Sequence, residues 1–169
     1  KYVFPGQRVN IQAVSHKSKL YHSDGVAERV LGAIADHFAM TNQKPCVQDP
    51  TGQLVLVRIV NDACTISIDS SGELLHKRGY RLAVAKAPLR ETHAAAMILA
   101  SGWDGVADFI DPFCGSGTIP IEASLISRNI PPGIARSFAF IKWPVTESAV
   151  WEDLLAKAKE NILPPRASI

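Results

Sequence analysis

The stretch DPFCGSGT, from Asp111 to Thr118, has the residue types of a ligand-binding loop. It begins with a carboxylate and a proline, and two glycines flank a serine further along. Glycine adopts positive φ angles and lets the backbone come close to a ligand. A helix that begins near Thr118 would point free N–H groups and its positive dipole end at the same place. The loop therefore predicts either a site for a small ligand with an anionic group, with adenosine as the expected remainder, or a tight turn without a ligand.

Several better-known loops do not match this stretch. No lysine follows Gly117, so the phosphate loop of nucleotide triphosphatases is absent. The dinucleotide pattern GxGxxG is incomplete, which disfavours a nucleotide-binding oxidoreductase, and the nucleophile elbow GxSxG is missing. Cys114 resembles a cysteine nucleophile only in standing beside a glycine, and we expect it to pack against the following helix without a chemical role.

The elements around the loop indicate a Rossmann-like α/β unit. An alanine-rich segment that opens with Pro88 in its first turn predicts a helix closed by Gly102, with Leu89 and Leu99 on one face. Residues 106–110, VADFI, predict a buried strand, and residues 118–128 predict the helix after the loop. Because this half contains only one convincing buried strand, we expect the chain to be a part of a longer protein. Its unpaired apolar surface, on Val106, Phe109 and Ile110, would then favour self-association.

The first half of the chain predicts an α+β arrangement. Residues 8–14 alternate as a half-buried strand, and a helix over residues 23–38 has Ser23 as its N-cap. Residues 54–60 and 64–69 predict a hairpin within an antiparallel sheet. A last amphipathic helix is expected over residues 146–161.

Composition excludes several classes of protein. The net charge is +2, so only local clusters can argue for nucleic acid. Three widely spaced cysteines and the lack of any CxxC pair argue against a disulfide scaffold or a metal site and favour a cytoplasmic location. No apolar run is long enough to span a membrane.

The densest basic stretch and the acidic residue Glu122 each have two possible interpretations. The densest basic stretch contains Lys77, Arg78, Tyr80 and Arg81, and it predicts either contact with single-stranded or looped RNA or an ordinary solvated surface. Glu122 lies on the helix after the loop and is either a buried acceptor for loop N–H groups or an exposed acid.

The residues DPFCGSGTIPIEASLISRNIPPGIARSFAF resemble the S-adenosylmethionine loop of the THUMP-domain RNA methyltransferases. The stretches GELLHKRGYRLAVAKAPLRETHAAAMI and VNIQAVSHKSKLYHSDGVAERV resemble the family's connecting region and the later part of its THUMP region, respectively. The match is nearest to the bacterial group that methylates the exocyclic N2 of guanine in 23S ribosomal RNA, formerly labelled as N6-adenine-specific DNA methylases. The resemblance implies a THUMP-like RNA-binding part over residues 1–84 and the start of a class I methyltransferase domain over residues 85–169.

The resemblance also implies which residues form the cofactor site. S-adenosylmethionine would be bound by the loop and by the first turn of the helix before it, that is, by Asp111, Pro112, Phe113, Cys114, Gly115, Ser116, Gly117, Thr118, Arg90, Glu91 and Thr92. The family's catalytic Asn/Asp-Pro-Pro-Tyr/Phe loop is not in the sequence, so no catalytic residue is assigned and we expect this chain alone to be inactive. An adenine-specific DNA amine methyltransferase and a non-catalytic RNA-binding module remain as alternatives.

Overall fold

The computed structural model describes residues 1–81 and 88–169, which form two units. The first unit consists of Lys1–Gly72 and Phe138–Thr146, and the second of Glu73–Ser137 and Glu147–Ile169. The predicted boundary between residues 84 and 85 lies outside the described residues, and it remains a prediction.

A four-stranded mixed sheet forms the centre of the first unit. Its strands are β1 (Arg8–His16), β2 (Val47–Gln48), β3 (Gln53–Val60) and β4 (Ala63–Ile68), in the order β2-β1-β3-β4. The β3–β4 hairpin is antiparallel, as the sequence predicts, but β1 runs parallel to both of its neighbours. The prediction of an antiparallel sheet is therefore wrong for β1, because the chain returns through a helix rather than a hairpin before it forms β3.

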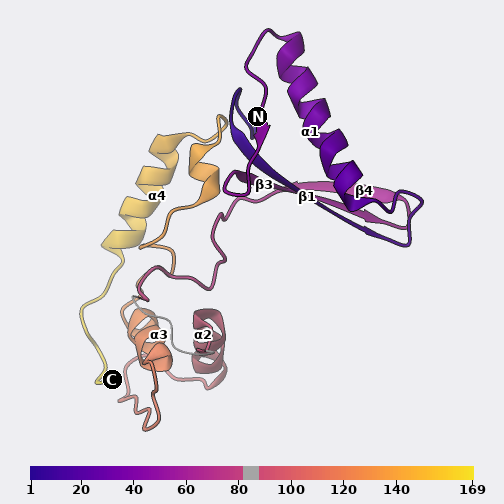
Figure 1. Cartoon of the computed structure of the whole chain (residues 1–169). Helices are drawn as coiled ribbons and strands as arrows, with labels where there is room; N and C mark the ends of the chain where they lie inside the picture. The colour runs from indigo at the N-terminus through magenta and orange to yellow at the C-terminus, as the bar shows by residue number, and fades with distance from the viewer. Residues whose placement is uncertain (82–87) are drawn as a thin grey trace. The chain divides into compact units, whose positions relative to one another are not determined.

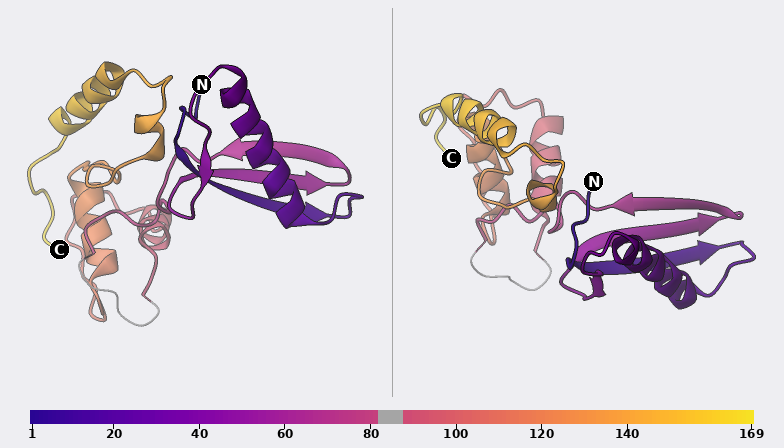
Figure 2. Two further views of the ribbon diagram at one scale, coloured as in Figure 1. Left: turned by 45° about the horizontal axis from the view of Figure 1, so that its top comes forward. Right: turned by 90° about the horizontal axis from the view of Figure 1, so that it is seen from above.

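Helix α1 (Ser23–Met40) provides that return and covers one face of the sheet (Figures 1 and 2). Every second residue of β1 and β3 faces it, including Val9, Ile11, Val55, Val57 and Ile59, all of which are buried. The predicted helix is confirmed, but His22, without a side-chain cap, holds the N-cap position that the sequence predicts for Ser23.

The β3–β4 turn is fixed by two residues with positive φ. Asn61 has φ 50° and Asp62 has φ 63°, which matches the two-residue turn whose twist suits a hairpin. The Asp62 carboxylate also accepts a hydrogen bond from the Lys19 backbone N–H at 2.7 Å. The turn thereby holds the loop after β1 against the end of the sheet.

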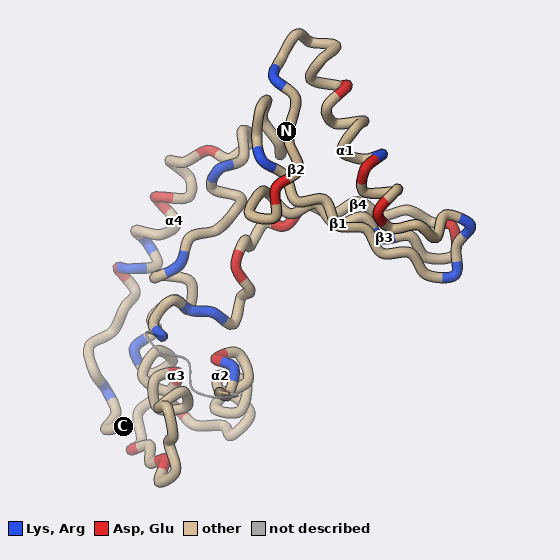
Figure 3. The backbone as a smooth tube through the Cα atoms, viewed as in Figure 1, with Lys and Arg blue, Asp and Glu red and all other residues tan. Residues whose placement is uncertain are grey.

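Helices dominate the second unit, which contains α2 (Glu91–Ala100), α3 (Thr118–Ser127) and α4 (Ser148–Glu160). The short helix η1 (Ala139–Lys142) belongs to the first unit. Helices α2 and α3 pack against each other, as Figure 1 shows. Lys and Arg positions are distributed over both units among the acidic ones, in keeping with the nearly balanced charge (Figure 3).

Helix α2 differs from its prediction in its start and in its buried face. It begins at Glu91 with Arg90 at the N-cap, so Pro88 precedes the helix instead of opening it. The buried residues are Glu91, Ala94 and Ile98, whereas Leu99 is exposed. The error arises because apolar residues, most of them alanines, lie on all sides of this helix. Its sequence therefore does not show which face is buried.

The strand predicted over residues 106–110 is not formed. Val106 and Ile110 are exposed, which matches the predicted apolar surface, and Phe109 is half-buried. A strand needs a ladder of backbone partners, and this segment has one such bond in the described residues, from Phe109 N–H to the Ser168 carbonyl at 2.9 Å.

Residues 1–81 and 88–169 contain neither a membrane-spanning helix nor a cluster of metal ligands. None of their helices combines the length and apolar character that crossing a membrane requires. None of their His, Cys, Asp and Glu side chains gather in threes or more around a point where a metal ion could bind.

Candidate functional site

The glycine loop has the backbone conformation that its sequence predicts. Gly115 has φ +54° and Gly117 has φ +74°, and Gly117 is the N-cap of α3. A Cβ added at Gly115 would meet no atom within 4 Å, and one added at Gly117 would meet only Ile121 Cδ1, at 3.8 Å. Both positions therefore require glycine because of their φ angle rather than because of crowding, and the space around the loop is open.

The start of α3 presents unpaired donors at this loop. Gly117 N–H donates to the Cys114 carbonyl at 2.8 Å and closes the turn. The N–H groups of Thr118 and Ile119 have no acceptor among the described residues, and Pro120 has no N–H to satisfy. Such groups at a helix N-terminus favour an anionic partner.

The first half of the loop is largely exposed. Asp111 accepts a hydrogen bond from Phe113 N–H at 3.1 Å, which leaves its second carboxylate oxygen available. Pro112 is exposed, as is the Phe113 side chain at 93%. Cys114 is exposed too, so the prediction that it packs against the helix is wrong. Gly117, in the left-handed conformation, directs the chain into α3, and residues 112–116 before it stay exposed.

Of the three predicted residues around the start of α2, two point away from the protein interior. Arg90 and Thr92 are exposed, whereas Glu91 is only 5% exposed. Glu91 accepts a hydrogen bond from Arg81 Nε at 3.1 Å, within an ion pair.

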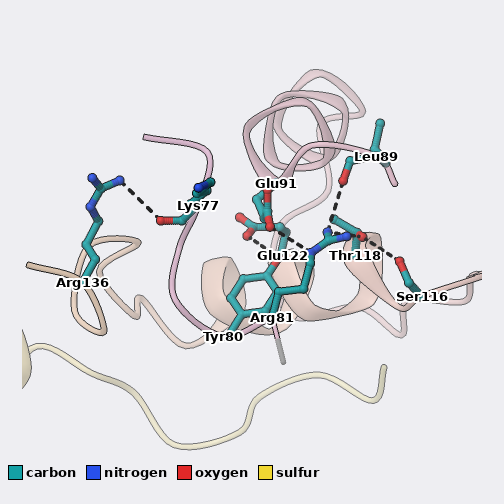
Figure 4. A network of polar contacts seen from close by, with 9 residues as sticks. All are labelled: Lys77, Tyr80, Arg81, Leu89, Glu91, Ser116, Thr118, Glu122 and Arg136. Atoms are coloured by element: carbon teal, nitrogen blue, oxygen red, sulfur yellow. Dashed lines mark hydrogen bonds and ion pairs between the residues drawn. The ribbon is translucent and has the colours of Figure 1, made fainter. Parts of the chain in front are cut away.

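Arg81 links this helix to the glycine loop (Figure 4). Besides its bond to Glu91, its Nη2 donates to the Leu89 carbonyl at 3.2 Å and to Thr118 Oγ1 at 2.9 Å. Thr118 Oγ1 in turn lies 3.2 Å from Ser116 Oγ. A continuous chain of polar contacts therefore runs from α2 through Arg81 to the middle of the loop.

Glu122 is the centre of a second group of contacts. Its carboxylate is 2% exposed and accepts from Arg78 Nη2 at 3.1 Å and from the Tyr80 hydroxyl at 3.0 Å. It is thus buried, but its partners come from residues 78–80 and not from loop N–H groups. Burial, together with the nearby negative charge of Glu122, raises the pKa of Tyr80 well above its usual value.

The basic stretch is directed mostly inward, which does not favour its predicted role in RNA contact. The side chains of Arg78 and Arg81 are 13% and 17% exposed and are paired with Glu122 and Glu91. Lys77 remains exposed, in a surface pair with Glu73 at 2.9 Å. RNA contact by this stretch stays a prediction, and Lys77 is the one of its four residues whose charge faces solvent.

Sequence reasoning missed two residues that shape this segment. Gly79 has φ +92°, and a Cβ there would lie 2.7 Å from the Ala135 carbonyl oxygen. Arg136 donates to the backbone carbonyls of Leu74 and Lys77 at 3.1 and 3.4 Å. A glycine within the basic stretch, between Arg78 and Tyr80, was the available signal for a close approach, whereas nothing in the sequence marks Arg136.

A cavity of about 510 Å³ lies in the first unit, beside α1. Its walls are mainly apolar, from Val26, Val30, Val57 and Ile59, with Lys19 and Arg29 among the lining residues. It includes none of the residues that the sequence analysis assigns to the cofactor or to RNA.

The mixed α/β fold is similar to that of solved methyltransferases, and the comparisons with known proteins identify the family. Residues 78–168 match the model of the RMKL-like methyltransferase domain. The chain belongs to this family. The matched region starts at Arg78, so it includes both the loop and the polar contacts that reach it.

Individual relatives extend the similarity to nearly the whole chain. Ribosomal RNA large subunit methyltransferase K/L of Syntrophotalea carbinolica is 38% identical over 89% of this chain and 22% of its own length. "Putative RNA methyltransferase slr0064" of Synechocystis is 37% identical over 94% of this chain and 42% of its own length. The chain therefore spans less than half the length of these relatives.

Two solved structures share the fold. One is described as a "predicted N6-adenine-specific DNA methylase" from Listeria monocytogenes, with a TM-score of 0.79 and 33% identity, over 98% of this chain and 45% of that one. The other is SMU.472, described as "a putative methyltransferase complexed with SAH", with a TM-score of 0.81 and 31% identity, over 98% of this chain and 44% of that one.

Proposed function

We propose that this chain is part of an S-adenosylmethionine-dependent RNA methyltransferase that methylates the exocyclic N2 of a guanine in 23S ribosomal RNA. The observation that carries the proposal is the open glycine loop at the start of α3, which lies inside the region matched by the methyltransferase family.

The residues of the loop fit the amino-acid end of the cofactor. S-adenosylmethionine carries a carboxylate, and its sulfonium supplies an activated methyl group. The free N–H groups of Thr118 and Ile119 are suited to that carboxylate, and the exposed Ser116 hydroxyl lies beside them. The second oxygen of Asp111 is available for the ligand's amine or hydroxyl groups. The related SMU.472 structure is a complex with SAH, which supports the same class of ligand.

The names of the relatives support RNA as the substrate. The Syntrophotalea carbinolica protein is named for the large-subunit ribosomal RNA, and the Synechocystis protein is named for RNA. We assign RNA binding to the THUMP-like residues 1–84 and place the reaction in the cytoplasm, where the three unpaired cysteines would stay reduced. The catalytic loop expected for the family is not in this sequence, so methyl transfer itself requires the full-length protein.

The proposal is tested by titrating the chain with S-adenosylhomocysteine in a calorimeter. We expect saturable binding that is lost in a Gly115→Val, Gly117→Val variant, because valine is strained at the positive φ of both positions. The matched control is Gly102→Ala, which alters a glycine of φ +73° in open space outside the loop. Binding that survives in the valine variant, or no binding by a folded chain, would count against a cofactor site in this loop.

An adenine-specific DNA amine methyltransferase is a second candidate, favoured by the name given to the Listeria monocytogenes protein. The two candidates differ in the acceptor. We expect the full-length protein to transfer radiolabelled methyl groups to protein-free 23S ribosomal RNA and not to duplex DNA. The opposite preference would establish the second candidate.

A further inference from the structure

We infer that Arg81 is a positioning residue, which makes the Ser116 hydroxyl a hydrogen-bond donor toward the anionic group of the bound ligand. This inference rests on the proposed function, since the ligand is taken to be the cofactor. It begins with the chain of contacts from Arg81 through Thr118 to Ser116 (Figure 4).

The first link has a fixed direction. A guanidinium group has only donors, so Thr118 Oγ1 must accept the bond from Arg81 Nη2 at 2.9 Å. Arg81 itself is held in place by two further bonds, to the Glu91 carboxylate and to the Leu89 carbonyl. Its planar fork is therefore fixed before any ligand arrives.

The second link follows from burial. Thr118 is 3% exposed, so the proton of its hydroxyl needs an acceptor inside the protein. Within the part of the chain that the structure describes, the acceptor in reach of this proton is Ser116 Oγ, at 3.2 Å. Although either hydroxyl could donate by distance alone, burial of Thr118 favours donation from Thr118 to Ser116.

These two links determine the direction in which the Ser116 hydroxyl donates. Its oxygen accepts from Thr118, and its own proton is left to point away from the protein, because Ser116 is exposed. Next to it lie the unpaired N–H groups of Thr118 and Ile119. Together, these three donors at the start of α3 favour a carboxylate over a neutral group.

The test compares two ligands that differ in that carboxylate. S-adenosylhomocysteine carries it, whereas 5′-methylthioadenosine keeps the adenosine and thioether and lacks the amino-acid end. For Arg81→Lys, which keeps the charge and loses the fork, we expect about a tenfold weaker Kd for S-adenosylhomocysteine, as for the loss of one well-placed hydrogen bond. The Kd for 5′-methylthioadenosine should stay within about twofold.

Three further variants test the contacts beyond Arg81. Ser116→Ala alters an exposed side chain and should show the same loss for S-adenosylhomocysteine alone. Adding Arg81→Lys to Ser116→Ala should then weaken binding little further, because both changes break the same chain of contacts. Arg128→Lys is the matched control, since Arg128 caps the other end of α3 and donates to the Leu163 carbonyl at 3.2 Å.

Equal losses for both ligands would overturn the inference in favour of a purely structural role, and so would fully additive losses or no loss. Hydrogen exchange of the ligand-free chain provides a readout without cofactor. In Arg81→Lys, exchange at residues 115–119 should quicken while α4 stays unchanged. If the full-length protein fails to bind S-adenosylhomocysteine, the proposed function is wrong, whereas unchanged exchange at this loop would overturn the positioning role by itself.

Discussion

Replacing Glu122 with glutamine should destabilise the protein by about 3–5 kcal/mol, although the two side chains have the same shape. The Glu122 carboxylate is 2% exposed and its partner Arg78 is 13% exposed, so neither charge can turn to water when the other is lost. Glutamine can still accept from the Tyr80 hydroxyl through its Oε1, which leaves the unpaired charge of Arg78 as the main penalty. Since a domain is usually stable by only about 5–15 kcal/mol, this loss is large.

The assay is urea unfolding followed by far-ultraviolet circular dichroism, with the slope of the transition checked for constancy between variants. The double variant Arg78→Met, Glu122→Gln removes the unpaired charge and should recover most of the stability. Two results would refute the reasoning: a loss below about 1 kcal/mol in Glu122→Gln, which is the range of solvent-exposed pairs, or a double variant no more stable than the single one.

Three further predictions concern the same unit and the buried thiol of the first unit. Gly79→Ala should lower the unfolding temperature and weaken cofactor binding together, because its Cβ would collide with the Ala135 carbonyl and displace the residues on both sides; a normal melting curve would contradict this. The raised pKa of Tyr80 means that the folded state keeps a proton that the unfolded state loses, so stability should fall as the pH rises above about 10. In Tyr80→Phe, the free energy of unfolding measured above about pH 10 should fall less steeply with pH than in the wild type. Burial raises the pKa of the Cys46 thiol, so a thiol reagent should modify the two exposed cysteines of the native protein first and Cys46 only slowly.

The first half of the fold could be predicted from local patterns. Residues 54–60 are mostly β-branched or apolar and residues 64–69 alternate. The turn at Asn61 and Asp62 has the residue types of a tight hairpin, so the β3–β4 pair follows directly. The direction of β1 could not be read in the same way. A strand pattern fixes which side chains share a face, but the partner strand and its direction depend on the path of the chain through α1.

In the candidate site, the conformation of the loop was predictable and its support was not. Gly115 and Gly117 identify positions of positive φ from residue type alone. Arg78 and Arg81 look like any basic surface in the sequence, because their partners Glu122 and Glu91 are 44 and 10 residues away. Charge runs are usually solvated, and only the folded chain shows which carboxylates they neutralise.

The strand predicted at residues 106–110 shows a different limit. Its apolar residues satisfy a strand pattern, yet a strand exists only with neighbours to pair with, and pairing is not a property of the segment. The apolar residues indicate that the segment tends to form a strand. Among the described residues, however, it makes one backbone hydrogen bond, from Phe109 N–H to the Ser168 carbonyl.

The short segment Phe138–Thr146 has a consequence for how this protein could have evolved. It belongs to the first unit, where Trp143 Nε1 donates to the Gln53 side chain at 2.9 Å and the Trp143 ring lies 5.1 Å from that of Tyr2. Its neighbours on both sides in the sequence belong to the second unit. No single crossover in the gene can therefore exchange one unit cleanly for that of a relative. A cut between Gly72 and Phe138 separates Phe138–Thr146 from the rest of its unit, and a cut after Thr146 divides the second unit. The two units should accordingly have been inherited together, with changes at Gln53 and Trp143 tracking each other across homologues.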